Sequence, residues 1–152
     1  MASQVSVAAS VSVQSSPERA FAELIDAEGQ GRWMLGTKIF PVEGGIPSPD
    51  VGSRLVAFTG LAGIGILDVI EVTEHQPGRR WVVAHKGRVI RGSGIFTVEP
   101  AAGGGATVRW IEELDLPFGI IGRVGWPIVR PAVRWGLQHS LNKLGALLKA
   151  ST

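Results

Sequence analysis

The segment Val5–Ile25 reads VSVAASVSVQSSPERAFAELI, and it contains the first strand and the first helix of the fold that we predict. Valine recurs at positions 5, 7, 11 and 13 with serine or alanine between them, and this period of two is typical of a strand with one buried face. The strand should end at Ser15-Ser16-Pro17, because serine can cap a helix and proline fits its first turn. The apolar positions that follow have the spacing of one helix face: Ala20, Phe21, Leu24 and Ile25.

A second short helical piece is predicted over 26–33, weakened by two glycines, and the chain then changes character. From Ile39 to Leu116, short runs rich in Val, Ile, Phe, Thr and Trp alternate with Gly, Pro and Asp, which indicates a series of strands. Connections this short favour antiparallel neighbours, since a parallel crossover needs about a dozen residues or more. We expect strands near 39–43, 53–59, 66–75, 80–86, 89–99 and 107–116, with turns at Gly44-Gly45, 60–65, 76–78, Gly87 and 102–105.

The last third of the chain, Pro117 to Ala150, has helical periodicity. One sector of the helical wheel is apolar and should be buried against the strands: Val129, Val133, Leu137, Leu141, Leu144 and Leu148. Trp135 and His139 fall roughly opposite this sector, so we expect them to point outward. Pro131 should kink this helix or mark its first turn, because proline lacks an N–H and crowds the preceding carbonyl.

Length and composition limit the classes of protein that fit. The 152 residues suit one domain, which we take as 1–152, and the content of 45% hydrophobic and 18% charged residues is that of a globular chain. A formal charge of +2 gives no basis for a nucleic-acid partner. The absence of cysteine excludes disulfides, a thiolate nucleophile and thiolate metal ligands. Composition leaves open whether the protein is a monomer or a homodimer.

Neither an export signal nor a cofactor site is indicated. The N-terminal residues lack the basic start and continuous apolar core of a secretory signal. The longest uncharged stretch, 55–67, is too short and too glycine-rich for a transmembrane helix, so we expect a soluble cytoplasmic protein. No pair of histidines has metal-ligand spacing, and we therefore predict no metal and no cofactor.

Alternation along the strands predicts which polar side chains face inward. Every second residue of a strand points to the same face, so large apolar residues show which polar neighbours face inward. Glu112 alternates in this way with Trp110 and Leu114, and Asp68 with Ile70 and Val72. His85 does so with Trp81 and Val83. Asp68, His85 and Glu112 are therefore our candidate cavity residues and best candidates for catalysis, because a histidine and carboxylates in an apolar environment can transfer protons. The alternative is that the carboxylates are solvated at strand ends and that His85 meets water near Gly87. A bulge at Gly92 or Gly94 would change these assignments.

Other residues have both a structural and a functional interpretation. Trp33, Trp81 and Trp110 are expected to form core or cavity wall. The glycine-rich segment 60–65 is interpreted either as an apolar lid over a cavity mouth or as a plain hairpin connection, and His75 as a loop residue. Trp126 and Trp135, with Arg123, Arg130 and Arg134, form an aromatic and basic group that suits a membrane surface, although ordinary packing with solvated arginines is the more common explanation.

Several strings resemble the START-like superfamily, also called SRPBCC or Bet v 1-like, and within it bacterial polyketide cyclase/dehydrase-like proteins. These strings are Ser16-Pro17-Glu18-Arg19-Ala20-Phe21, Trp33, Val72-Thr73-Glu74 before Pro77, Gly92-Ser93-Gly94-Ile95-Phe96, Trp110-Ile111-Glu112-Glu113-Leu114 and Pro117-Phe118-Gly119. The resemblance implies an α+β helix-grip fold, in which a curved seven-stranded antiparallel sheet wraps around the long C-terminal helix and two short helices follow the first strand. It also implies a tunnel between sheet and helix that binds lipids, sterols, polyketides or hormones; only some members are enzymes.

Three functions remain open from the sequence. The first is binding of a small apolar molecule in the tunnel, with these expected contacts: Trp33, Phe58, Ile70, Val83, His85, Phe96, Trp110, Glu112, Leu137 and Leu141. The second is a cofactor-free cyclase or dehydratase that uses His85 with Glu112 or Asp68. The third is a peripheral lipid-handling protein that docks on a membrane through Trp126, Arg130 and Trp135.

Overall fold

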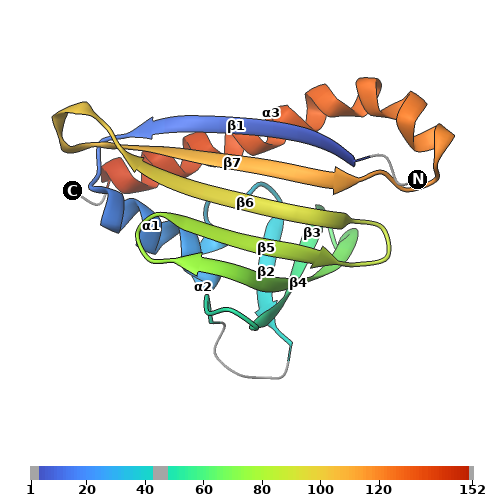
Figure 1. Cartoon of the computed structure of the whole chain (residues 1–152), viewed down its shortest axis with the longest axis horizontal. Coiled ribbons are helices and arrows are strands. Elements are labelled where there is room, and N and C mark those ends of the chain that lie inside the picture. Colours follow the sequence, from blue (N-terminus) through green and yellow to red (C-terminus); the bar gives the residue numbers. More distant parts are fainter. Residues whose placement is uncertain (1–3, 43–47, 151–152) are drawn as a thin grey trace.

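The structure is a computed structural model that describes residues 4–42 and 48–150. Its elements, in chain order, are β1 Gln4–Val13, α1 Pro17–Ile25, α2 Ala27–Gln30, β2 Thr37–Pro41, β3 Arg54–Leu61, β4 Ile64–Gln76, β5 Arg80–Lys86, β6 Arg91–Pro100, a 3-10 turn Ala102–Gly104, β7 Ala106–Asp115 and α3 Ile120–Ala150. This is the predicted order of a strand, two short helices, six strands and a long helix (Figure 1).

The strands form one antiparallel seven-stranded sheet in the order β1-β7-β6-β5-β4-β3-β2. The sheet curves, and α3 packs mainly against β1 (Figure 1). The predicted helix-grip architecture is therefore confirmed. No helix in the described part of the chain is long and apolar enough to cross a membrane.

The second half of α3 supplies the apolar face that the wheel predicts. Leu137, Leu141, Leu144 and Leu148 are buried, and Val133 packs against the same core while partly exposed. Val129 differs from the prediction, because its side chain is 51% exposed. The reason is that the first half of α3 extends beyond the sheet, where no strand covers it (Figure 1). Pro127 and Pro131 both lie inside this helix.

The start of the fold follows its local sequence closely. The side chain of Ser16 accepts a hydrogen bond from the backbone N–H of Arg19 and caps α1, and Pro17 occupies the first turn. The strand predicted at 39–43 lies two residues earlier, at Thr37–Pro41, and the turn predicted at Gly44-Gly45 lies outside the described residues.

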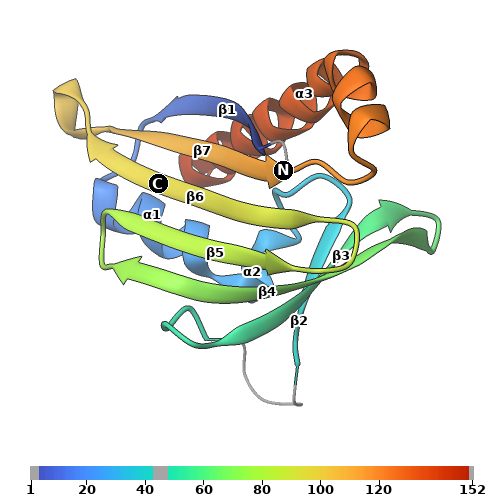
Figure 2. The same ribbon diagram turned by 45° about the vertical axis from the view of Figure 1, so that its right-hand side comes forward.

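The segment 60–65 is a hairpin in which β3 and β4 continue to Leu61 and Ile64, so the plain connection is the observed one. Only Ala62 and Gly63 join the strands, both with positive φ of 54° and 79°, as expected for a tight turn whose twist matches the strands. Leu61 and Ile64 are exposed, and Figure 2 shows the hairpin extending from the end of the sheet near the β5–β6 loop.

The strand β4 contains a bulge near its end. The pairing of β4 with β5 shifts between Val72 and Glu74, so the strand continues in opposite phase and places His75 opposite Trp81. Because β4 continues to Gln76, His75 is a strand residue, as the strand predicted at 66–75 implies, and the separate prediction of a loop residue was wrong. Its ring stacks on that of Phe21, with ring centroids 5.8 Å apart. The bulge lies beyond Asp68, and the registers around Gly92 and Gly94 are unshifted.

Candidate functional site

Three strands bring Asp68, His85 and Glu112 together on the concave face of the sheet. Asp68 comes from β4, His85 from β5 and Glu112 from β7, and all three follow the parity predicted from their apolar neighbours. Asp68 and Glu112 are buried, and the His85 side chain is only 13% exposed. The sequence-based alternative of solvated carboxylates at strand ends is thus not what the structure shows.

The three side chains form one continuous chain of hydrogen bonds. His85 Nδ1 lies 2.5 Å from Asp68 Oδ2, and His85 Nε2 lies 2.9 Å from Glu112 Oε2. The second oxygen of each carboxylate is also occupied: the N–H of Gly87 donates to Asp68 Oδ1 at 3.1 Å, and Trp110 Nε1 donates to Glu112 Oε1 at 2.6 Å. Buried polar groups need such partners, and here every side-chain oxygen and nitrogen of the cluster has one.

A glycine on the intervening strand makes this contact sterically feasible. His85 on β5 pairs with Gly92 on β6, and Glu112 on β7 pairs with Gly94 on β6. The imidazole therefore reaches across the whole width of β6 to contact Glu112. A Cβ at Gly94 would lie 3.1 Å from Glu112 Oε1 and 3.2 Å from Val83 Cγ2. Gly94 therefore leaves the space that the His85–Glu112 hydrogen bond occupies.

The charges of the cluster follow from its geometry. Burial by itself lowers the pKa of His85, but the hydrogen bonds and charges of Asp68 and Glu112 outweigh it and raise this pKa to about 10. At neutral pH the ring is an imidazolium that donates both N–H groups to carboxylates. It has no free nitrogen lone pair, and hence it is not poised as a general base.

Aromatic rings support the cluster from the core side. Trp110, whose N–H donates to Glu112, packs edge-on against Trp33, with ring centroids 6.1 Å apart. Phe96 packs in a tilted arrangement against both Trp110 and Trp81, at centroid distances of 5.0 and 5.7 Å. Trp33 is fully buried, and its Nε1 has no hydrogen-bond partner among the described residues. This N–H is therefore a buried donor without a partner among the described residues, which is uncommon in folded proteins.

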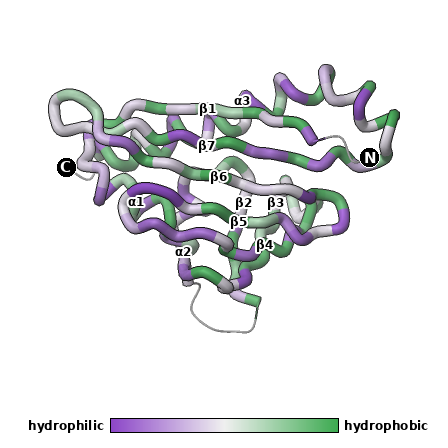
Figure 3. Tube along the Cα trace, viewed as in Figure 1, coloured by the Kyte–Doolittle hydropathy of each residue, from purple (hydrophilic) through white to green (hydrophobic). Residues whose placement is uncertain are grey.

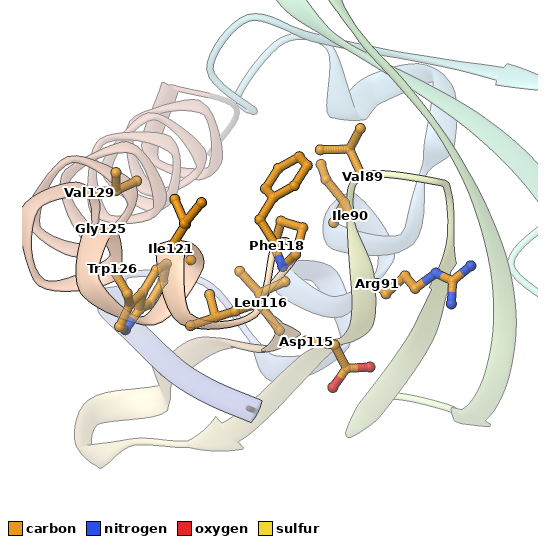
Figure 4. Close-up of a pocket in the computed structure, with 13 residues that line it drawn as sticks. Val89, Ile90, Arg91, Asp115, Leu116, Phe118, Ile121, Gly125, Trp126 and Val129 are labelled. Carbon is orange, nitrogen blue, oxygen red and sulfur yellow. The ribbon is translucent and has the colours of Figure 1, made fainter. Parts of the chain in front are cut away.

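An apolar pocket of about 350 Å³ opens next to the cluster, where the first half of α3 leaves the sheet. Its wall combines the β5–β6 loop, the end of β7 and the first turns of α3: Val89, Ile90, Leu114, Leu116, Phe118, Ile121, Trp126 and Val129 (Figure 4). Leu114 lies between the pocket and the cluster. It is two residues after Glu112 on the same face of β7, and both Leu114 and His85 pair with Gly92 of β6. The charged residues at the rim, Arg91 and Asp115, point away from the apolar side chains (Figure 4).

The fold agrees with a comparison against protein families. Residues 4–149 match the family described as polyketide cyclase / dehydrase and lipid transport. The chain belongs to this family. No curated protein sequence matches it.

Solved structures confirm the fold of this family member at low sequence identity. A protein from Thermus thermophilus, TTHA0849, has a TM-score of 0.80 at 18% identity, with 97% of this chain and 99% of that chain covered. A START superfamily protein from Mycobacterium smegmatis has a TM-score of 0.76 at 15% identity, with coverages of 97% and 99%. The polyketide cyclase-like protein Cgl2372 from Corynebacterium glutamicum has a TM-score of 0.66 at 17% identity, with coverages of 99% and 95%.

The ligand contacts predicted for this family member lie in three places. His85, Trp110 and Glu112 form the polar cluster with Asp68. A second group is buried in the core: Trp33, Ile70, Val83, Phe96, Leu137 and Leu141. Phe58 lines a second hollow of about 260 Å³ beside Met34 and the β3–β4 hairpin. The assignment of these residues to ligand binding stays a prediction.

None of the ten ligand contacts predicted from the sequence lines the apolar pocket. Its wall is made where the segment 89–91 meets the segment 114–129, and neither strand alternation nor helix periodicity predicts such a tertiary contact. One signal was present: the segment Leu116 to Val129 carries six large aliphatic residues but only one charge, which is unusual for the start of a helix that has no strand to cover it. In the described part of the chain, no group of His, Asp and Glu side chains is arranged to hold a metal ion.

Proposed function

We propose that this protein binds a small, neutral, apolar molecule in the pocket between the first half of α3 and the adjoining ends of β6 and β7. The supporting observation is the lining, which is almost entirely aliphatic and aromatic around a volume of about 350 Å³. Small-molecule sites typically enclose about 300–1,000 Å³ and have mostly apolar walls. Burial of an apolar ligand there is favourable by about 25 cal/mol for each Å² removed from water.

The charges around the pocket argue for a neutral ligand. Arg91 and Asp115 turn away from it (Figure 4), and the polar atoms of the neighbouring cluster are occupied by one another. An ionic head group would lose its hydration without gaining a partner. Apolar walls discriminate by only about 1–3 kcal/mol per methylene, so the site should accept a class of compounds related in size and shape.

Gly125 offers a direct test, because it lines the pocket and a Cβ added there meets no atom within 4 Å. The Gly125→Phe variant should fill the pocket without displacing the backbone. Titration with N-phenyl-1-naphthylamine, a neutral apolar fluorophore, should give saturable binding to the wild type and at least about tenfold weaker binding to the variant, because the ring takes the place of the probe.

The matched control is Ala132→Phe, which adds the same ring at an exposed position of α3 outside the pocket. Its affinity for the probe should equal that of the wild type. Wild-type protein that fails to bind the probe, or a Gly125→Phe variant that binds it normally, would refute the proposed site.

A cofactor-free cyclase or dehydratase is the second candidate, and the Asp68–His85–Glu112 cluster favours it. Because His85 is an imidazolium, it would act as a proton donor or a fixed positive charge. Poly-β-keto and β-hydroxyacyl thioesters are the substrates to test, with mass spectrometry to detect loss of water. His85→Gln should then abolish turnover but leave probe binding intact; equal turnover by wild type and variant would exclude this mechanism.

A further inference from the structure

The outward face of the first half of α3 carries an apolar stripe formed by Ile120, Val124, Ile128 and Trp135. Their side chains are 77%, 69%, 80% and 61% exposed. At about 100° per residue they fall within a sector of about 80°, and this part of the helix extends beyond the sheet (Figure 1). Figure 3 shows hydrophobic and hydrophilic positions alternating along it, as in an amphipathic helix. We call these four residues the α3 stripe.

The α3 stripe is not explained by the core or by the apolar pocket. The core takes its leucines from the second half of the helix, beginning at Leu137. The pocket uses Trp126 and Val129, which lie on another side of the helix, and Ile121 at the edge of the stripe. Four large apolar side chains thus remain in water on one face, and a contiguous exposed patch of this kind marks an interaction surface.

The charges beside the α3 stripe have one sign. Arg123, Arg130 and Arg134 are exposed and lie together on one flank of the stripe. None of the three makes an ion pair with any described residue. The sequence from Leu116 to Ala150 contains no aspartate and no glutamate, so the charged side chains of this helix are all basic.

We propose that the α3 stripe docks on a membrane surface that contains anionic lipids. An amphipathic helix of this composition lies in the interface, with its apolar side chains below the head groups and its arginines among the phosphates. Trp135 suits that position, since its ring combines an apolar body with one N–H donor. The surface is separate from the ligand pocket and does not depend on it.

A second copy of the chain is a poorer partner for the same surface. In a twofold dimer with its axis through the stripe, the stripe would pack against its own copy, and the two arginine flanks would lie on opposite sides of the interface. The three arginines would find no opposite charge on the partner helix, because this helix has no acidic side chain. Lipid phosphates supply the missing negative charge, whereas self-association through this helix would leave the arginines without an opposite charge.

The test is co-sedimentation with vesicles of phosphatidylglycerol and phosphatidylcholine at low salt, with phosphatidylcholine vesicles for comparison. The wild type should bind the anionic vesicles, and salt should weaken binding by screening the arginines. Ile128→Asp should lower the affinity at least about tenfold, because a charge would enter the apolar boundary. Arg123→Gln with Arg130→Gln should weaken binding to the anionic vesicles alone.

Two controls separate docking from other effects. Phe40→Asp changes an exposed apolar residue on β2, at the opposite edge of the sheet, and should bind vesicles like the wild type. Gly125→Phe should also bind them normally although it blocks the pocket, so that failure of docking and failure of ligand binding are distinguishable. Circular dichroism of each variant checks that it is folded.

Three results would overturn the proposal. One is a wild type that does not sediment with anionic vesicles at low salt. Another is an Ile128→Asp variant, folded by circular dichroism, that binds as well as the wild type. The third is a wild-type dimer in analytical ultracentrifugation that Ile128→Asp dissociates without any vesicle binding, which would make the α3 stripe a self-association surface.

Discussion

Raising the pH from 7 to 10 should destabilise this protein through His85. In the unfolded chain a histidine titrates near pH 6.5, whereas in the fold the pKa of His85 is raised to about 10. The stabilisation is therefore complete below about pH 6.5 and is lost as the pH rises through the folded pKa, because unfolding then releases a proton. Between pH 6.5 and about pH 10, each pH unit lowers the free energy of unfolding by about 1.4 kcal/mol. Raising the pH from 7 to 10 should therefore remove on the order of 4 kcal/mol.

That loss is a large part of the stability of an ordinary domain, about 5–15 kcal/mol. Urea unfolding at pH 7, 8, 9 and 10, followed by tryptophan fluorescence, measures it directly. The chain has no cysteine and no tyrosine, so few other groups titrate in this range. The His85→Gln variant lacks the titrating ring and should have a much flatter dependence on pH, although it is less stable at pH 7.

A second measurement does not depend on the stability of the variant. In NMR spectra of the wild type, one of the three histidines should keep its ring proton up to about pH 9, because its two hydrogen bonds stabilise the charged form. Titration of every histidine near neutrality, or a parallel loss of stability by wild type and His85→Gln as the pH rises, would contradict the raised pKa of His85.

Three stability predictions concern single packing and capping contacts, each measured by urea unfolding at pH 7. Gly94→Ala should cost about 1–3 kcal/mol, because its Cβ would lie 3.1 Å from Glu112 Oε1; a neutral effect would mean that the space above β6 is not needed by the His85–Glu112 contact. Leu144→Ala should cost about 2–5 kcal/mol, since this side chain is fully buried beneath the sheet, and a loss below about 1 kcal/mol would contradict the packing of α3. Ser16→Ala should cost about 0.5–2 kcal/mol by removing the cap that receives the Arg19 N–H, whereas Ser16→Asp should retain it.

Local patterns predicted most of the fold, because alternation and helical periodicity report directly on burial. Val5 to Val13 became β1, and the leucines of α3 became its buried face. The errors arose beside a turn and where a neighbouring strand is missing. His75 was assigned to a loop because it precedes the 76–78 turn, but β4 continues to Gln76. Val129 has the spacing of a buried residue, but the sheet ends before it.

The candidate site divides in the same way. Strand alternation correctly placed Asp68, His85 and Glu112 on one face of the sheet. It did so because no bulge separates these polar residues from the apolar residues that were used to assign the face. That His85 reaches Glu112 across β6 depends on Gly94, and a glycine in a strand can equally mark a bulge. The pocket depends on where α3 leaves the sheet, which is a tertiary property that no local pattern contains.

The absence of side chains at Gly92 and Gly94 of β6 also affects how the strands separate on unfolding. The hydrogen bond between His85 and Glu112 passes over these two glycines and joins β5 directly to β7, and both strands also pair with β6. Separating one of the three strands therefore breaks hydrogen bonds of the other two. Their amide protons should therefore exchange with deuterium together, in one slow cooperative unit, while the β3–β4 hairpin exchanges quickly. Deleting the imidazole should divide that unit into independently opening strands.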